Sequence, residues 1–139
     1  MGEIDASMLL PSRLSCIEQA RRWMRAHTEA VGMPEREITE IEVAMTEALS
    51  NVMLHSLGGR QDRAVPLRLV IDEQRLCLGI EDHGQPFEPE RYIAPSLEAP
   101  REGGYGVYLI ESLMDEVHRT PIKEGGTRVL LVRYRSKEQ

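Results

Sequence analysis

Aromatic residues are scarce in this sequence of 139 residues. It contains one Trp, one Phe and four Tyr, although 41% of its residues are hydrophobic. A core built from this composition has to be mainly aliphatic, with a contribution from the seven Met residues. The length suits one domain with one core, so we expect residues 1–139 to form a single domain.

Cysteine and long apolar runs are also sparse. Cys16 and Cys77 stand far apart without the spacing of a metal site, so we expect two reduced thiols packed as small hydrophobic side chains. No apolar run approaches the roughly 20 residues that span a bilayer. The acidic first residues lack the pattern of a signal peptide. We therefore expect a cytoplasmic protein that makes no membrane contact.

Positive charge is in short supply. The sequence has 17 Lys and Arg against 23 Asp and Glu, a formal net charge of −6. Non-specific binding of nucleic acid requires clustered positive charge that neutralises phosphates. The composition argues against direct contact with nucleic acid and leaves a basic protein partner open.

The hydrophobic pattern predicts an ordered series of elements. Helices are expected at about 15–30, 34–55 and 105–114. Strands are expected at 8–10, 65–72, 75–82, 117–120 and 127–134. The proline-rich segment at about 87–103 has no periodicity, which is typical of a lid or binding loop. This order predicts an α/β fold, a two-layer α/β sandwich with a mixed, mostly antiparallel sheet and helices on one face.

The helix at 34–55 carries a polar seam beside its apolar stripe. Glu47 and Asn51 lie one turn apart on this seam, with Val43 and Leu54 on its other side. A partly desolvated carboxylate is suited to accept a proton, and an Asn oxygen is a neutral, hard ligand for Mg²⁺ held beside phosphate. A solvated helix edge contains the same residue types, so the pair alone does not distinguish a functional site from an ordinary exposed edge. The wheel predicts exposure for Glu42, Thr46 and Met53.

A polar turn follows the strand at 75–82. Asp82 at the strand end can accept a hydrogen bond from an exocyclic amine such as that of adenine, and Gly84 lets a flat ring lie against the backbone. An ordinary turn also favours Asp and Gly. His83 has no other His or Cys at metal-site spacing, so we expect no zinc site.

Three glycines surround the start of the helix at 105–114. Gly103, Gly104 and Gly106 permit close approach to the free N–H groups of a helix start, which point toward anions. No Gly-Lys-Ser/Thr follows, and no strand runs directly into the glycines, so the pattern is neither a P-loop nor a Rossmann fingerprint. Arg101 beside them is either a phosphate contact or a solvated charge.

Together, these motifs resemble the ordered boxes of the GHKL superfamily of ATPases and kinases. Residues 42–51 resemble its N-box, 82–87 its G1 box, 101–110 its G2 box and 125–127 its terminal glycine-threonine motif. The short length, the compact lid and residues 113–117 are similar to the anti-sigma-factor serine-protein kinases of the RsbW and SpoIIAB type.

This resemblance implies the Bergerat fold, an α/β sandwich that binds Mg-ATP beneath a lid. It implies that Glu47 is the catalytic base for a substrate Ser or Thr hydroxyl and that Asn51 holds Mg²⁺. It further implies that Asp82 recognises adenine with support from Thr127. The other positions expected to bind ATP are Gly84, Pro86, Phe87, Arg101, Gly104, Tyr105, Gly106 and Val107.

The resemblance also implies partners. The expected protein is a serine/threonine kinase that phosphorylates a small anti-anti-sigma (STAS-type) protein, sequesters a sigma factor and forms a homodimer. Arg21 matches a partner-contacting arginine of the family.

Other functions share parts of this pattern. The main alternative is a module that binds ATP and sequesters a partner without phosphotransfer; Glu47, kept polar between apolar flanks, favours the kinase. We expect neither a histidine-kinase catalytic domain nor a gyrase-type ATPase. The sequence offers no helix with a phospho-acceptor His, and it is too short for a transducer domain.

Overall fold

A single antiparallel sheet organises the protein. The computed structural model describes residues 3–83, 105–122 and 125–136. Within them the strand order is β1-β2-β3-β5-β4, and each neighbouring pair is antiparallel. The strands are β1 (Ile4–Pro11), β2 (Ala64–Ile71), β3 (Arg75–Asp82), β4 (Glu116–Pro121) and β5 (Thr127–Tyr134). The predicted two-layer sandwich is confirmed; where a mixed, mostly antiparallel sheet was expected, the described strands pair only in antiparallel fashion.

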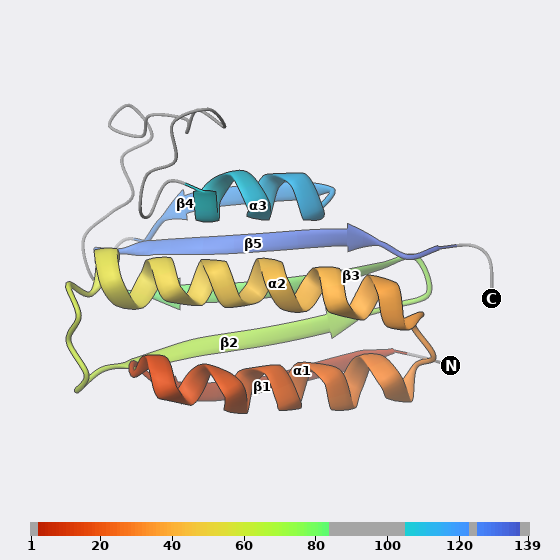
Figure 1. The fold of residues 1–139 in the computed structure, drawn as a ribbon, viewed down its shortest axis with the longest axis horizontal. Helices are drawn as coiled ribbons and strands as arrows, with labels where there is room; N and C mark the ends of the chain where they lie inside the picture. The colour runs from red at the N-terminus through yellow and green to blue at the C-terminus, as the bar shows by residue number, and fades with distance from the viewer. Residues whose placement is uncertain (1–2, 84–104, 123–124, 137–139) are drawn as a thin grey trace.

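The helices cover one face of this sheet, as predicted (Figure 1). They are α1 (Ile17–Ala30), α2 (Glu35–Asn51) and α3 (Tyr105–Leu113). A 3-10 turn, η1 (Leu14–Cys16), precedes α1, and a π-helical turn, η2 (Val52–Ser56), follows α2. Of the helices in the described ranges, none combines the length and the apolar character that crossing a bilayer requires. The predicted lid at about 87–103 lies outside the described residues.

Aliphatic side chains fill the space between helices and sheet. Successive strand residues point to opposite faces, so alternate residues of β2 and β3 face the helices. These residues are all at most 2% exposed: Leu67, Leu69, Ile71, Leu76, Leu78 and Ile80. From α2, Ile38, Ile41, Met45 and Leu49 are buried against them. Each such side chain contributes about 1.5–3 kcal/mol when fully buried, which makes this core the main source of stability.

Local chemistry sets the ends of the elements. Gly32 follows α1 with φ of 78°, a left-handed conformation that glycine adopts without strain. Pro34 caps α2 with φ of −62°. Between β2 and β3, the Asp72 carboxylate accepts hydrogen bonds from the backbone N–H groups of Gln74 (2.8 Å) and Arg75 (2.9 Å). These bonds hold the pKa of Asp72 below its usual range.

The prediction that Met53 is exposed was wrong. Met53 is 1% exposed, because η2 changes the helical phase. The N–H of Leu57 donates to the Val52 carbonyl at 2.8 Å, five residues back. A turn closed in this way holds more residues than an α-helical turn, so an ideal wheel fails after Asn51. Glu42 and Thr46, also expected to be exposed, are half-buried.

Candidate active site

Four segments that carry the predicted motifs meet at one end of the molecule. At that end α2 and β3 finish, at Asn51 and Asp82, and α3 and β5 begin, the latter at Thr127. All four ends lie at the left of Figure 1. α2 and α3 also pack against each other. The fold therefore gathers polar residues that are far apart in the sequence.

Gly106 brings the glycine-rich motif onto the polar seam of α2. Gly106 is buried in the first turn of α3, while Glu47 and Asn51 are half-buried on α2. A Cβ added at position 106 would lie 2.8 Å from Glu47 Oε1 and 3.5 Å from both polar side-chain atoms of Asn51. A side chain at this position would require the Glu47 carboxylate to move, so the start of α3 lies directly over the Glu-Asn pair.

Asp82 and Thr127 form a second polar pair on the sheet. They are direct neighbours in the β3–β5 register and are 2% and 4% exposed, respectively. Both occupy the strand face that points toward the helices, in line with Ile80 and Leu78 of β3. A carboxylate accepts more than one hydrogen bond, so an acid in this place can accept one from a donor on the helix side.

Gly126 holds the backbone of β5 against the end of β3. Its φ is 102°, and an added Cβ would lie 2.0 Å from the Asp82 carbonyl oxygen and 2.7 Å from the His83 Cα. Those contacts are impossible for any other residue without moving backbone. The glycine before Thr127 therefore fixes how closely that residue approaches Asp82.

Part of the predicted ATP site lies outside the described residues. Gly84, Pro86, Phe87, Arg101 and Gly104 lie outside the described residues. Tyr105 is the first residue of α3, and its side chain is outside the described part as well. Val107 is described and is half-buried in α3.

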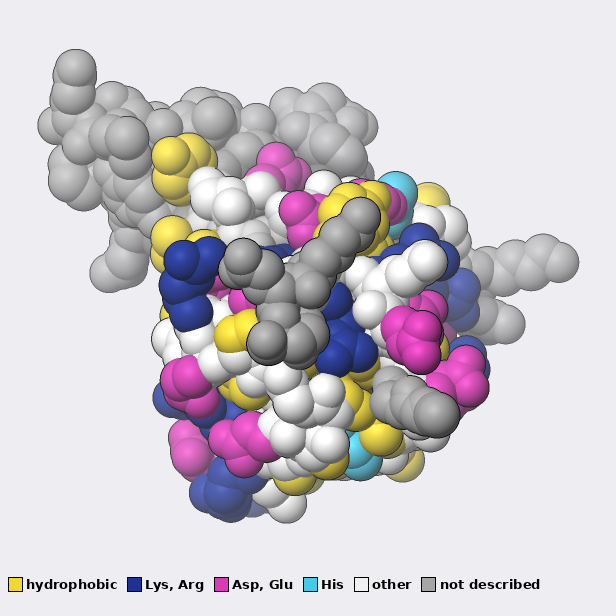
Figure 2. Space-filling model, turned by 90° about the vertical axis from the view of Figure 1, so that its right-hand side faces the viewer, with side chains coloured by type: hydrophobic (Ala, Val, Ile, Leu, Met, Phe, Trp, Pro, Cys, Tyr) yellow, Lys and Arg dark blue, Asp and Glu magenta, His cyan; other side chains and the backbone are white. Residues whose placement is uncertain are grey.

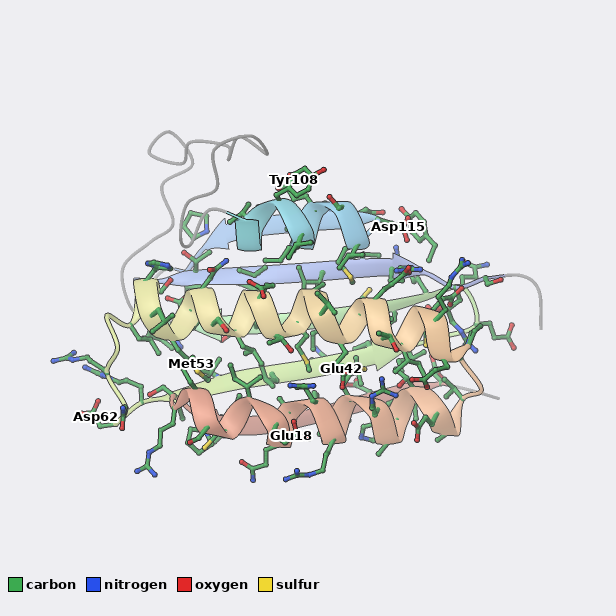
Figure 3. The ribbon with its side chains drawn as sticks, in the orientation of Figure 1. Glu18, Glu42, Met53, Asp62, Tyr108 and Asp115 are labelled. Carbon is green, nitrogen blue, oxygen red and sulfur yellow. The ribbon has the colours of Figure 1, made fainter. Side chains whose placement is uncertain are left out.

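Arg21 belongs to an ion-pair network between α1 and α2. Its side chain is 41% exposed and lies 3.5 Å from carboxylate oxygens of both Glu18 and Glu42. Arg25 donates to both Glu42 oxygens, at 2.9 and 3.1 Å, and to Glu35. Figure 3 shows Glu42 between the two helices. The hydrogen bonds from Arg25 hold the pKa of Glu42 below its usual range and raise that of Arg25.

Sequence reasoning missed a half-buried arginine on β5. Arg133 continues the helix-facing positions after Val129 and Leu131, yet its side chain is only 14% exposed. It donates to Glu40 of α2 and to the carbonyl of Leu113, the last residue of α3. A charged residue at a core-facing position of an apolar strand was the available signal.

The donor set suits a metal that arrives with phosphate. The described ranges, 3–83, 105–122 and 125–136, hold no group of three or more His, Cys, Asp or Glu arranged around a metal. Mg²⁺ is commonly held by one or two protein oxygens plus waters and substrate phosphates. The Asn51 amide beside the buried glycine at the start of α3 fits that pattern.

Comparison with known families settles the family. Residues 10–133 match the family model described as histidine kinase-like ATPase domain. The chain belongs to this family. Among curated proteins, the serine-protein kinase RsbW of Staphylococcus epidermidis is 30% identical over 141 residues, covering 95% of this chain and 87% of that protein. RsbW of Listeria monocytogenes is 26% identical, covering 96% and 88%. The predicted resemblance to the RsbW type is confirmed.

Solved structures share the fold. A crystal structure of the RsbU and RsbW domains of a Mycobacterium tuberculosis protein has a TM-score of 0.70 at 16% identity, and it covers 96% of this chain and 33% of that one. The SiaB-SiaC complex from Pseudomonas aeruginosa gives 0.65 at 15% identity, covering 93% and 88%. At these identities the likeness concerns the histidine kinase-like fold alone.

Proposed function

We propose that this protein is an ATP-dependent serine/threonine-protein kinase that acts on an anti-anti-sigma protein. The observation that carries the proposal is the contact of Gly106 with Glu47 and Asn51. It sets a helix start, a side-chain amide and a carboxylate around one point, which are the parts that phosphoryl transfer needs: phosphate positioning, metal binding and proton acceptance. Membership in a family with relatives named serine-protein kinase RsbW supports the same activity.

Each polar residue of the site has a separate task in this proposal. Asn51 holds Mg²⁺ through its side-chain oxygen, and the N–H groups at the start of α3 receive phosphate oxygens. The bound Mg-ATP supplies the phosphoryl group and the charge neutralisation that its transfer requires. Glu47 accepts the proton of the substrate hydroxyl as that oxygen bonds to the terminal phosphorus.

Adenine recognition falls to the sheet. The buried Asp82 carboxylate accepts a hydrogen bond from the exocyclic amino group, and Thr127 supports this contact from the neighbouring strand. Gly84, Pro86, Phe87, Arg101, Gly104, Tyr105 and Val107 complete the proposed ATP site. Their assignments rest on the sequence motifs.

The proposed partners follow from the family. The protein binds a sigma factor in the cytoplasm and releases it in favour of the unphosphorylated anti-anti-sigma protein, acting as a homodimer. Arg21 of α1 contacts a protein partner in this proposal. The side chain is 41% exposed, so a partner can reach its guanidinium. The carboxylates of Glu18 and Glu42 hold the guanidinium in place on the helix surface.

An intact-mass measurement tests the proposed kinase. The protein is incubated with Mg-ATP and a candidate STAS-type protein from the same genome, and the partner is weighed by mass spectrometry. We expect a gain of one phosphate on a Ser or Thr, absent when Mg-ADP replaces Mg-ATP. Nucleotide-dependent binding of the partner without a mass change contradicts the kinase and supports the binding module instead.

Sedimentation velocity tests the proposed homodimer. The chain alone is measured across a concentration series, with and without Mg-ATP. A species of about 32 kDa, twice the mass of the 15.8 kDa chain, is expected. A monomer at every concentration contradicts this part of the proposal and leaves the kinase assignment unaffected.

A further inference from the structure

Arg133 joins three elements at the end of α3 that lies away from the candidate active site. Its Nη2 donates to Glu40 Oε1 on α2 at 2.6 Å, and its Nη1 donates to the carbonyl oxygen of Leu113 at 2.8 Å. Its Nε lies 4.0 Å from Asp115 Oδ2, just past the end of α3 (Figure 3). The last turn of a helix leaves carbonyls without partners, and a cation is favourable there.

These contacts give α3 two fixed points on α2. At one end Gly106 rests over Glu47 and Asn51. At the other end Leu113 is tied through Arg133 to Glu40. Glu40 precedes Glu47 by about two helical turns, and Gly106 precedes Leu113 by the same interval. The two helices therefore run in opposite directions, with matching contacts two turns apart (Figure 1).

We propose that Arg133 is a positioning residue for phosphoryl transfer. By clamping Leu113 to Glu40, it fixes how α3 lies along α2 and so holds Gly106 over Glu47 and Asn51. This inference rests on the proposed function, since it concerns the placement of the phosphate and metal groups of the same site.

The chemistry of the clamp favours Arg over other residues. The guanidinium donates in a fixed fork, so one side chain can serve the carboxylate of one helix and the carbonyl of another. Removing it would leave the Leu113 carbonyl and the Glu40 carboxylate without this partner. Site geometry is sensitive to such losses, because a displacement of about 1 Å can cost on the order of 100-fold in rate.

Arg135, the first residue after the end of β5, provides a control. Its guanidinium donates to two backbone carbonyls, those of Asp72 (2.8 Å) and Val31 (3.0 Å), whereas that of Arg133 donates to one carbonyl and one carboxylate. Both acceptors lie outside α3. Arg133→Gln and Arg135→Gln each remove two hydrogen bonds from a guanidinium, and of the two substitutions only Arg133→Gln removes a bond to α3.

Two calorimetric titrations of each variant separate positioning from general damage. Mg-ATP probes the phosphate and metal groups, whereas adenosine probes only the base pocket of Asp82 and Thr127. We expect Arg133→Gln to lose about tenfold in Mg-ATP affinity with adenosine affinity unchanged. Arg135→Gln is expected to keep both affinities at a similar melting temperature.

The outcomes separate this inference from the proposed function. If the unaltered protein binds no Mg-ATP, the proposed function fails. If the unaltered protein binds Mg-ATP but the Arg133→Gln variant has the same affinities as the Arg135→Gln variant, Arg133 does not position the site. The same conclusion follows if Arg133→Gln lowers the affinities for Mg-ATP and adenosine equally. Arg133→Lys decides the question if the Gln variant does not fold: Lys keeps the charge but cannot reproduce the fork, so wild-type Mg-ATP affinity in that variant also overturns the inference.

Discussion

Three glutamates in the first half of α2 differ from Glu47 in the second half in the partners of their carboxylates. In the first half, the carboxylates of Glu35 and Glu42 accept hydrogen bonds from Arg25, and that of Glu40 from Arg133. In the second half, Glu47 has no Lys or Arg of the described residues at ion-pair distance, and Gly106 lies over it instead. Figure 2 looks onto the end where α2 begins, and acidic and basic side chains are interspersed there.

The difference in partners separates glutamates that stabilise the fold from Glu47, the proposed proton acceptor. Hydrogen bonds from arginine stabilise the charged form of a carboxylate and occupy its oxygens, so such a carboxylate is a poor proton acceptor. A carboxylate without a cation, on the same helix and beside a helix start, remains available to a substrate. The same residue type on one helix thus anchors the scaffold at one end and serves the proposed reaction at the other.

Glu47→Gln should give the largest effect. The amide keeps the size of the side chain but cannot take up a proton, so phosphotransfer should fall by about 100-fold or more. Nucleotide binding and partner binding should persist. Single-turnover transfer of phosphate to the partner measures the rate, with Glu42→Gln on the first half as the control. A normal rate in Glu47→Gln removes this residue from the mechanism.

Asn51→Ala should act on binding. Loss of the amide oxygen removes the proposed protein ligand of Mg²⁺, and affinity for Mg-ATP should fall about 10- to 100-fold. Calorimetry with Mg²⁺ and with a chelator checks the assignment. The ATP affinities of the variant and the unaltered protein should differ in Mg²⁺ and be similar in chelator. An equal loss of affinity in both conditions would indicate that Asn51 acts without the metal.

Arg25→Gln tests the first half of α2. This side chain bonds Glu35 and Glu42 and is 26% exposed, so its loss should lower the melting temperature by about 2–4 °C. The loss should shrink in high salt, because these charges are near the surface. Arg22→Gln is the control, since the Arg22 side chain is 69% exposed and its ion pair within the described part of the chain is with Glu18, at 3.6 Å. Reduced Mg-ATP affinity in Arg25→Gln would contradict the division of α2.

The smallest effect concerns the pH dependence of stability. The pKa of Glu42 is lowered from 4.5 in the folded protein, chiefly by the hydrogen bonds from Arg25. Its charged form therefore stabilises the fold above pH 4.5, and this contribution disappears as the pH falls through the lowered pKa. Glu42→Gln should cost about 1 kcal/mol or less at pH 7. Urea unfolding should show the gap closing below pH 4.5; a constant gap contradicts the linkage.

The sequence predicted local features well. Strict alternation in β2 and β3 identified six buried residues, and the apolar stripe of α2 identified its core face. Both patterns depend only on the side-chain period of the element. The prediction failed at Met53, where η2 departs from the α-helical period.

Contacts that cross the sheet were beyond sequence reasoning. Arg133 and Glu40 are 93 residues apart, and no short-range pattern relates them. Asp82 and Thr127 were assigned to one task through a family motif, and the β3–β5 register then placed them side by side. Strand order and register decide such pairs, and these depend on the packing of the whole sheet.

The wide turn η2 has a consequence for the evolution of this helix. The i→i+5 bond of this turn encloses one residue more than the i→i+4 bond of an α-helix. The turn Val52–Ser56 therefore has the form that results when one residue is inserted into an α-helix. Deleting a single position there would restore regular winding, rotate Met53 out of the core and redirect the chain that leaves Asn51. Relatives of different length should therefore absorb their gaps after this turn, where Gly58 and Gly59 already adopt left-handed conformations.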